Sequence, residues 1–97
     1  MHPAKVVRHR VACLTDLPNI GPAGAADLRL LGINKPEDLI GQDALALFER
    51  LCAITASKHD PCVLDVLMSV VDFMAGGEPK PWWQYTAQRK RLLSESR

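Results

Sequence analysis

The order of apolar and polar residues along the chain predicts a series of short helices and almost no strand. Apolar side chains recur three or four residues apart in most segments, whereas no long stretch alternates apolar and polar residues as a strand does. Proline or a capping residue opens several of these segments and glycine follows them, which are the usual signals for helix starts and ends. The predicted helices cover residues 22–31, 36–40, 44–56, 61–75 and 82–95, with a shorter one within 11–17.

The helix predicted at residues 61–75 is apolar on nearly every face, which is typical of the central, buried element of a small bundle. Only Asp65, Ser69 and Asp72 interrupt it, and their spacing of four and then three residues places them on one stripe. We interpret this stripe as the solvated side of the helix, because acidic side chains on a helix usually face water.

These patterns together predict an all-α fold. A chain of 97 residues supports one domain and leaves little room for a second. We expect a compact bundle of five to six helices at residues 13–95, preceded at residues 1–12 by a basic segment whose order the sequence leaves uncertain.

Residues 17–24, the turn segment, have the sequence Leu-Pro-Asn-Ile-Gly-Pro-Ala-Gly. Asn19 and Gly21 belong to the residue types that tolerate a positive φ most easily, and Pro22 suits the first position of a helix. We therefore expect a tight hairpin between a short helix that ends near Leu17 and the helix at 22–31. Ile20 would fill the gap between the two helices.

The start of the helix at 22–31 is a candidate anion site. The backbone N–H groups of Gly21, Ala23 and Gly24 have no partner within such a turn, and the helix dipole is positive there. A DNA phosphate would be held at this position without regard to the identity of the base. The alternative is a structural hairpin that only joins two packed helices.

Over about residues 15–39 this stretch resembles the helix-hairpin-helix motif of DNA repair and replication proteins. The pattern of that family is leucine, proline, glycine, a hydrophobic residue, glycine, a helix with alanine, and a closing glycine-isoleucine, here Gly32 and Ile33. The resemblance implies a monovalent cation held by backbone carbonyl groups, which here belong to Thr15, Leu17 and Ile20. It also implies that DNA phosphates contact Asn19, Ile20, Gly21, Pro22, Ala23 and Gly24.

The chain departs from the helix-hairpin-helix pattern at two points. Asn19 stands where the family has its first glycine, and we expect its side chain to crowd an approaching phosphate. The first turn of the following helix is neutral where the family commonly has a lysine or arginine, and Asp27 adds a negative charge nearby. The absence of a lysine or arginine from this turn removes a charge-assisted hydrogen bond to phosphate, worth about 1.5–3 kcal/mol.

Over about residues 13–91 the chain resembles the pathogenicity locus family of small bacterial helix-hairpin-helix proteins, some of them mitomycin-resistance-like. More distantly, it is similar to the C-terminal domain of the TfoX competence regulators, which share a Leu-Pro-Asn-Ile-Gly hairpin and a five-helix shape. Both resemblances imply a SAM-like bundle, and neither implies an enzyme. The segments that carry the first resemblance are the hairpin, Leu51-Cys52, Asp60-Pro61-Cys62-Val63-Leu64-Asp65, Asp72-Phe73, Pro81-Trp82-Trp83 and Arg89-Lys90.

Charge is unevenly distributed, although the net charge is only +1. Residues 1–13 and 81–97 each carry +3, whereas residues 14–80 carry ten acids against five cations. The near-neutral total argues against a protein that coats DNA by bulk charge. Basic ends can still meet a nucleic acid, and we expect both ends, especially Arg89, Lys90 and Arg91, to add counter-charge for phosphate. The alternative is that the basic ends are solvated or fold back onto the acidic middle.

The segment at residues 81–85 gathers Trp82, Trp83 and Tyr85 beside the basic cluster. We expect at least one tryptophan ring to seal the bundle. Exposed aromatic rings next to cations can stack on nucleic-acid bases or anchor a protein partner. These three residues therefore carry an alternative function, a protein–protein interaction adaptor that uses this segment or an exposed helix.

Three cysteines, an odd number, do not predict a structural disulfide. We favour buried, packed thiols. Cys52 and Cys62 form a redox-responsive pair in a second interpretation, because Cys62 lies near a helix start that favours a thiolate, an effect that Asp60 opposes. A third interpretation adds Cys13 and His59 to these two as a zinc site.

Neither membrane association nor catalysis is predicted. No apolar run approaches the ~18 residues of a membrane span and residues 1–10 are not a secretory signal, so we expect a cytoplasmic protein with no membrane partner. No nucleophile–base pair, metal-carboxylate cluster or phosphate-loop signature occurs, so we expect no enzyme and no cofactor besides the monovalent cation. The leading hypothesis is a helix-hairpin-helix module that binds DNA weakly and non-specifically in a DNA-related bacterial process.

Overall fold

The computed structural model describes residues 2–95, and every regular element in that range is a helix. The α-helices are α1 (Pro22–Leu30), α2 (Ala44–Thr55), α3 (Pro61–Met74) and α4 (Thr86–Glu95). Short 3₁₀ helices precede and connect them, namely η1 (Pro3–Lys5), η2 (Arg8–Arg10), η3 (Leu14–Asp16), η4 (Pro36–Leu39) and η5 (Trp82–Tyr85).

The all-α prediction is confirmed, but the expected five to six helices are not found, because residues 2–95 contain four α-helices. The helices predicted at 22–31, 44–56 and 61–75 correspond to α1, α2 and α3. The segments at 11–17 and 36–40 form only 3₁₀ turns, and the helix predicted at 82–95 is divided into η5 and α4. Segments this short form too few hydrogen bonds to offset the unfavourable free energy of nucleating an α-helix. A single 3₁₀ turn is enough to bury their few apolar residues.

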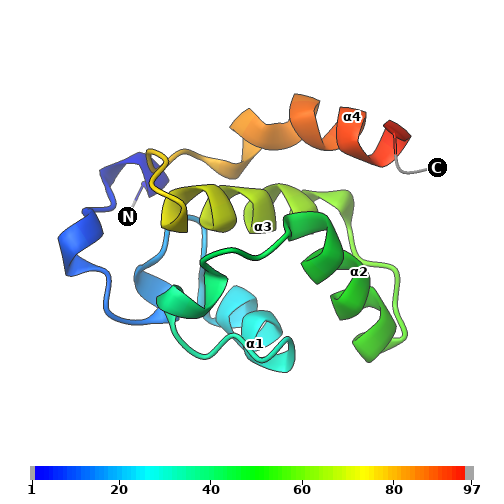
Figure 1. Cartoon of the computed structure of the whole chain (residues 1–97), viewed down its shortest axis with the longest axis horizontal. Helices are drawn as coiled ribbons and strands as arrows, with labels where there is room; N and C mark the ends of the chain where they lie inside the picture. Colours follow the sequence, from blue (N-terminus) through cyan, green and yellow to red (C-terminus); the bar gives the residue numbers. More distant parts are fainter. Residues whose placement is uncertain (1, 96–97) are drawn as a thin grey trace.

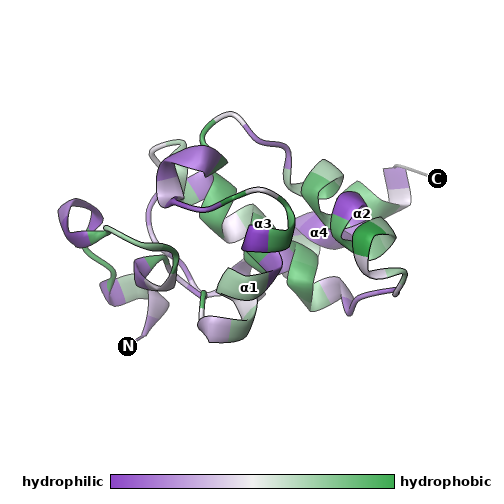
Figure 2. Ribbon diagram, turned by 90° about the horizontal axis from the view of Figure 1, so that it is seen from below, coloured by the Kyte–Doolittle hydropathy of each residue, from purple (hydrophilic) through white to green (hydrophobic). Residues whose placement is uncertain are grey.

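Helix α3 runs through the centre of the molecule, with α4 along one side and α1 and α2 on the other (Figure 1). Its start is set locally, because Asp60 accepts a hydrogen bond from the Cys62 N–H at 2.8 Å and Pro61 takes the first helical position. Hydrophobic residues dominate α2 and α3, whereas hydrophilic and hydrophobic stretches are mixed in the segment before η3 (Figure 2).

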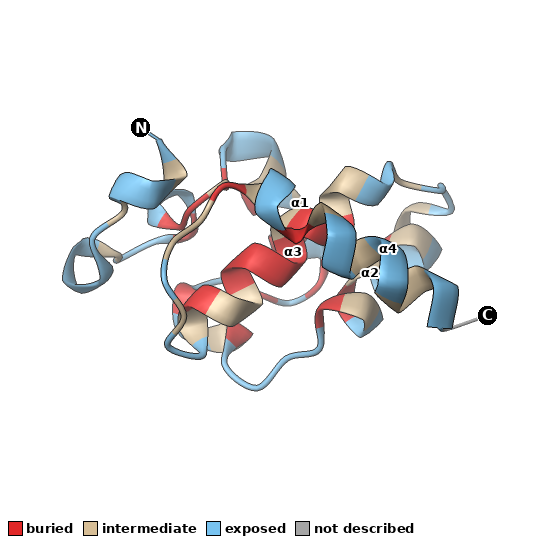
Figure 3. Ribbon diagram, turned by 90° about the horizontal axis from the view of Figure 1, so that it is seen from above, coloured by how far each residue is buried: buried red, intermediate tan, exposed pale blue. Residues whose placement is uncertain are grey.

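The core lies between α3 and the elements on its α1 and α2 side. Burial is deepest along α3, while α4 and the N-terminal segment are mostly exposed (Figure 3). No residue of α4 is fully buried, and it contributes only the partly buried Leu92 and Leu93 to the packing. The buried apolar residues are Leu14, Leu17, Ile20, Ala25, Leu28, Leu31, Ile33, Leu39, Ala44, Leu47, Leu51, Leu64, Leu67, Met68, Val70, Phe73 and Tyr85.

Two members of the polar stripe of α3 are buried and the third, Asp72, is half-buried, which corrects the interpretation of the stripe as the solvated side of the helix. Asp65 has no exposed surface and Ser69 is 1% exposed. The Asp65 carboxylate accepts a hydrogen bond from Arg89 Nε at 2.8 Å and another from the Thr86 hydroxyl at 2.7 Å. Asp65 therefore faces α4, and its ion pair with Arg89 holds that helix against α3.

The other two members of the stripe hold η5 and the turn segment. Asp72 accepts a hydrogen bond from the Tyr85 hydroxyl at 2.6 Å, which fixes η5. The Ser69 hydroxyl donates to the Val66 carbonyl at 2.6 Å and accepts from Asn19 Nδ2 at 3.0 Å, which fixes the turn segment. Within residues 2–95 no buried side-chain polar atom lacks a partner.

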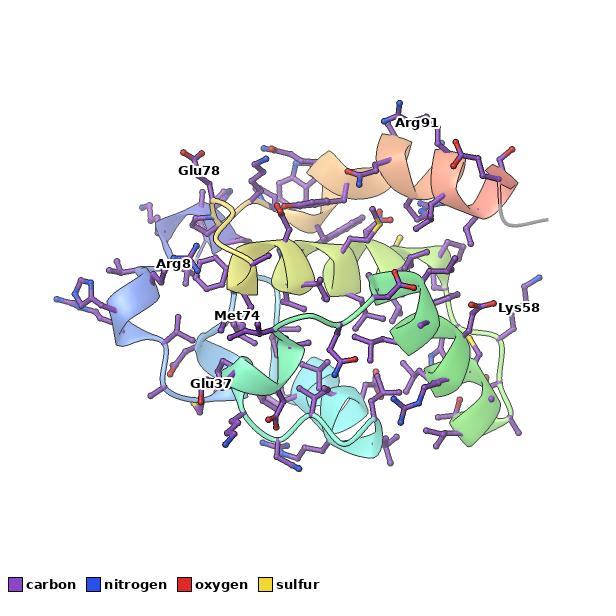
Figure 4. The ribbon with its side chains drawn as sticks, in the orientation of Figure 1. Arg8, Glu37, Lys58, Met74, Glu78 and Arg91 are labelled. Carbon is purple, nitrogen blue, oxygen red and sulfur yellow. The ribbon has the colours of Figure 1, made fainter. Side chains whose placement is uncertain are left out.

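Arg8 fastens the N-terminal segment to the end of α3. Its guanidinium donates to the carbonyl oxygens of Phe73 and Gly77, and it lies 4.0 Å from the centre of the Phe73 ring. A cation is favourable there because the last carbonyls of a helix carry partial negative charge. Figure 4 shows Arg8 beside this end of the helix, and Val6 and Val11 pack against the core.

Substitution of Arg89 tests whether the buried stripe holds α4 in place. Arg89→Ala leaves the Asp65 carboxylate buried with Thr86 as its remaining side-chain partner. We expect the free energy of unfolding to fall by about 3 kcal/mol, at the low end for breaking a buried ion pair, because the Arg89 side chain is 13% exposed. Chemical denaturation followed by circular dichroism measures this change.

The matched control is Arg91→Ala, which removes an exposed cation from the same helix. It should change the free energy of unfolding by less than about 0.5 kcal/mol. Equal losses in the two variants would show that α4 does not depend on the Asp65 ion pair.

The ionisation of Tyr85 provides a second test of the stripe. Burial and the hydrogen bond to Asp72 raise the pKa of Tyr85 above its ordinary value. Because the folded-state pKa exceeds the unfolded value of about 10, the stabilisation from the neutral phenol is complete below about pH 10 and is lost as the pH rises further. Tyr85→Phe should flatten this alkaline loss of stability.

Tyr85 is the one tyrosine of the sequence, so the ultraviolet absorbance of tyrosinate reports its ionisation directly. We expect the phenol to ionise at a higher pH in the native protein than in the denatured protein. Coincident titrations of the two states would contradict the buried hydrogen bond.

Candidate nucleic-acid interface

The turn segment leads from η3 into α1 in the way that its residue types predict, with one exception. Asn19 has a φ of +67°, in the left-handed region, and Pro22 occupies the first turn of α1. Gly21, in contrast, has extended backbone with a φ of −98° and a ψ of −171°. Ile20 is buried beneath the turn, and a Cβ placed on Gly24 would meet the Ile20 side chain at 3.5 Å.

The side chain of Asn19 turns into the protein. Its Nδ2 donates to the Ser69 hydroxyl and to the Lys80 carbonyl at 2.8 Å, and its Oδ1 accepts from the Trp82 N–H at 3.1 Å. The expectation that Asn19 crowds an approaching phosphate is therefore wrong. Asparagine adopts the backbone conformation expected of a glycine at this position and also clamps the turn segment to residues 80–82.

Three N–H groups at the start of α1 have no acceptor within the described residues. They belong to Gly21, Ala23 and Gly24, since the first helical hydrogen bond runs from the Ala25 N–H to the Gly21 carbonyl at 2.9 Å. Gly21 and Ala23 are exposed, and a Cβ on Gly21 would meet no atom within 4 Å. The donors and the dipole of α1 together favour an anion in this open space.

The three backbone carbonyls to which the helix-hairpin-helix resemblance assigns a monovalent cation are nearly without hydrogen-bond donors in the described part of the chain. In residues 2–95 the carbonyls of Thr15 and Ile20 accept no hydrogen bond, and the Leu17 carbonyl accepts only a long one of 3.4 Å from the Ile20 N–H. Uncharged oxygen ligands of this kind suit hard cations. A cation bound by these three groups would add positive charge to the turn segment.

The N-terminal segment faces the turn segment across a cleft of about 440 Å³. Lys5 and Arg10, from η1 and η2, line one wall, and residues 15–21 line the other. Neither cation forms an ion pair within the described part of the chain. The first turn of α1 has no cation of its own. The N-terminal segment instead brings Lys5 and Arg10 to the cleft beside it.

One acid, Asp16, also lines this cleft. Its carboxylate accepts the N–H groups of Ala12 and Cys13 at 2.9 and 3.0 Å. These two hydrogen bonds lower the pKa of Asp16 below its ordinary value, so its charge is retained at neutral pH. The charged side chains of the cleft are thus two cations and one carboxylate, and the carboxylate is already hydrogen-bonded.

The basic residues 89–91 are not brought to the turn segment. The Arg89 guanidinium is bound to Asp65, and this hydrogen bond raises the pKa of Arg89. Lys90 and Arg91 are exposed on α4, and Arg91 points away from the rest of the molecule (Figure 4). No α4 residue lines the cleft. The positive charge beside the turn segment thus comes from Lys5 and Arg10 of the basic N-terminal end, and not from residues 89–91.

Of the three aromatic residues in the predicted interaction segment, Trp83 is the exposed one, at 54%. Its ring lies edge-on to those of Trp82 and His2, with centroids 5.7 and 6.3 Å apart. Trp82 is half-buried, whereas Tyr85 is 6% exposed and bound to Asp72, so Tyr85 does not present an aromatic anchor.

The cysteines are all free thiols, Cys13 exposed and the other two half-buried. A hydrogen bond with Asp60 raises the pKa of Cys62, which disfavours the thiolate that the redox interpretation requires. Across residues 2–95 no group of three or more His, Cys, Asp or Glu side chains could hold a metal ion, so the zinc interpretation has no site there. In the same range no helix is long and apolar enough to cross a membrane.

Comparison with known proteins places this arrangement in a family. Residues 7–91 match the model of the pathogenicity locus family. The chain is also 42% identical over 81 residues to the mitomycin resistance protein McrB of Streptomyces lavendulae, a match that covers 84% of this chain and 77% of that protein. No solved structure matches the chain. Because the matched residues include the turn segment, the α3 stripe and its partners on α4, the chain as a whole belongs to the pathogenicity locus family.

Proposed function

We propose that this protein is a non-enzymatic helix-hairpin-helix module of the SAM-like type that binds DNA phosphates without sequence specificity. The proposal is carried by the exposed N–H groups at the start of α1, for which residues 2–95 offer no acceptor. In this interpretation η3 and α1 are the two helices of the motif, and the turn segment is the hairpin. Backbone donors hold a phosphate without reading the base, so the binding is non-specific.

The charge around the turn segment supports DNA as the partner. Lys5 and Arg10 line the adjoining cleft without acidic partners in the described residues, and the one acid there is hydrogen-bonded to two backbone N–H groups. An acidic surface at this place would instead have favoured a protein partner. Since phosphate contacts release counterions, the affinity should fall steeply as the salt concentration rises.

Trp83 supports a second candidate function, the docking of a protein partner. Its ring is more than half exposed, and tryptophan is enriched among residues that dominate the energy of protein interfaces. A complex held by Trp83 would persist at high salt and would be lost in Trp83→Ala. A DNA complex would instead dissociate as the salt concentration rises.

Substitution of Gly21 tests DNA binding by the turn segment. The extended backbone at Gly21 suits any residue and a Cβ there meets nothing, so both Gly21→Glu and Gly21→Gln should fold as the wild type does. Gly21→Glu places a carboxylate beside the free N–H groups and should weaken binding by about tenfold or more, because like charges at an interface cost several kcal/mol. Fluorescence anisotropy with duplex and single-stranded oligonucleotides, titrated with salt, measures the affinity.

Gly21→Gln is the matched control, since it adds a side chain of the same size without the charge, and it should lose less affinity than Gly21→Glu. Two unrelated oligonucleotide sequences should bind equally. Identical curves for the wild type and Gly21→Glu would remove the turn segment from the function. Failure of both duplex and single-stranded DNA to bind at low salt would overturn the proposal.

The name of the Streptomyces relative suggests a cellular process in which to look for this activity. That protein is named a mitomycin resistance protein, and we propose that the present chain acts in the same process. Its expression in a mitomycin-sensitive bacterium should raise survival on the drug, and Gly21→Glu should lose more of the gain than Gly21→Gln. If the wild type does not raise survival, a role in resistance is contradicted. If Gly21→Glu protects as well as the wild type, resistance does not depend on the turn segment.

A further inference from the structure

The cleft between the N-terminal segment and the turn segment has the size and position of a binding site that continues from the free N–H groups. Its volume of about 440 Å³ lies within the range of roughly 300–1,000 Å³ that is usual for small-ligand sites. Gly21, whose N–H is one of the three unpaired donors, belongs to its lining. A polymer bound at these N–H groups therefore has the cleft directly beside it.

The walls of the cleft combine two kinds of surface. Lys5 and Arg10 provide positive charge, while Val6, Val7 and Val11 provide an aliphatic wall. A nucleotide unit has the matching parts, a phosphodiester group and a base with apolar faces. An inorganic anion would use only the cations, and an apolar ligand would use only the valines.

Arg8, which lies between Lys5 and Arg10 in the sequence, anchors the segment that carries these two cations. Arg8 turns away from the cleft to the end of α3, where it binds the Phe73 and Gly77 carbonyls and stacks on the Phe73 ring. The segment carrying Lys5 and Arg10 is thus anchored to the central helix, while both cations remain exposed and without partners within residues 2–95. Their charge exceeds that of Asp16, the one acid of the lining, so the cleft is positive.

We infer that this cleft receives one nucleotide unit of a DNA single strand, with Lys5 and Arg10 paired to the phosphodiester group next to the one held at Gly21. The inference rests on the proposed function and deepens it, because it assigns a preference for one form of DNA. A double helix is too wide to enter a cleft of this volume, whereas an unpaired strand, an overhang or a gap can enter it. The aliphatic wall contacts the flat faces of a base, which are common to all bases, so this contact does not distinguish one base from another.

The test compares two double variants that remove the same charge from different places. Lys5→Gln/Arg10→Gln alters the cleft, and Lys90→Gln/Arg91→Gln alters exposed cations on α4. Because none of the four side chains forms an ion pair within the described residues, both variants should keep the wild-type circular dichroism spectrum and melting temperature. Each protein is titrated with a single-stranded oligonucleotide, a blunt duplex of the same length and the mononucleotide dAMP.

The cleft variant should lose about tenfold in single-strand affinity at low salt, and its log–log salt slope should decrease by about 0.7, the value for one phosphate of a single strand. The single-strand affinity of the α4 variant should change by less than about twofold. In the cleft variant, the duplex affinity should fall less than the single-strand affinity does. Equal losses in the two variants, or a cleft variant that behaves as the wild type, would overturn the cleft assignment.

These outcomes separate the inference from the function on which it rests. A loss of binding in Gly21→Glu together with an unchanged cleft variant refutes the cleft and leaves the turn segment as the DNA site. Binding of dAMP that depends on Lys5 and Arg10, without binding of either oligonucleotide, would make the cleft a site for free nucleotides and would overturn both proposals. Absence of binding to all three ligands would likewise overturn both.

Discussion

The carboxylate of Asp65, enclosed within an otherwise apolar helix, constrains the arrangement of the rest of the chain. It has no exposed surface, and an unpaired carboxylate in that position would cost several kcal/mol. The partners come from α4, where Arg89 and Thr86 each reach one of its oxygens. Helix α4 buries none of its own residues completely, so its register along α3 follows from these polar contacts more than from apolar packing.

The same face of α3 also sets the position of the proposed phosphate site. Ser69 holds the Asn19 amide, and Asn19 in turn holds the Lys80 carbonyl and the Trp82 N–H, so the turn segment and the residues before η5 are fastened together over α3. Arg8 binds the C-terminal end of this helix and positions the opposite wall of the cleft. Both walls are thus anchored to one rigid element, which prepares the site before any ligand arrives.

The parts of this structure that the sequence predicted are those determined locally. The bounds of α1, α2 and α3 follow from periodicity, proline and capping residues within a few positions of each helix end. The polar stripe of α3 was visible in the spacing of its residues, but local spacing cannot distinguish a face that meets water from a face that meets polar partners. Those partners lie 24 residues away for Asp65 and 50 residues away for Ser69.

A more distant signal was available in the C-terminal segment. Tyr85 and Arg89 share a helical face with Thr86 beside it, which makes a second polar stripe complementary to that of α3. Two matching polar stripes on neighbouring helices in a small apolar bundle indicate that each is buried against the other. The positions of Lys5 and Arg10 at the turn segment had no such signal, because they depend on how Arg8 meets the end of α3.

The two departures of the turn segment from the helix-hairpin-helix pattern affect the proposed site in different ways. A glycine in place of Asn19 would adopt the same backbone but would leave the turn without its hydrogen bonds to Ser69, Lys80 and Trp82. The second departure leaves the first turn of α1 neutral, and the nearest positive charge, from Lys5 and Arg10, lies across the cleft. A cation on α1 itself would attract any nearby phosphate, whereas cations across a cleft act on a strand that enters it. In the function proposed above, the neutral first turn of α1 weakens phosphate binding at the turn segment alone, and the shape of the cleft selects the form of DNA.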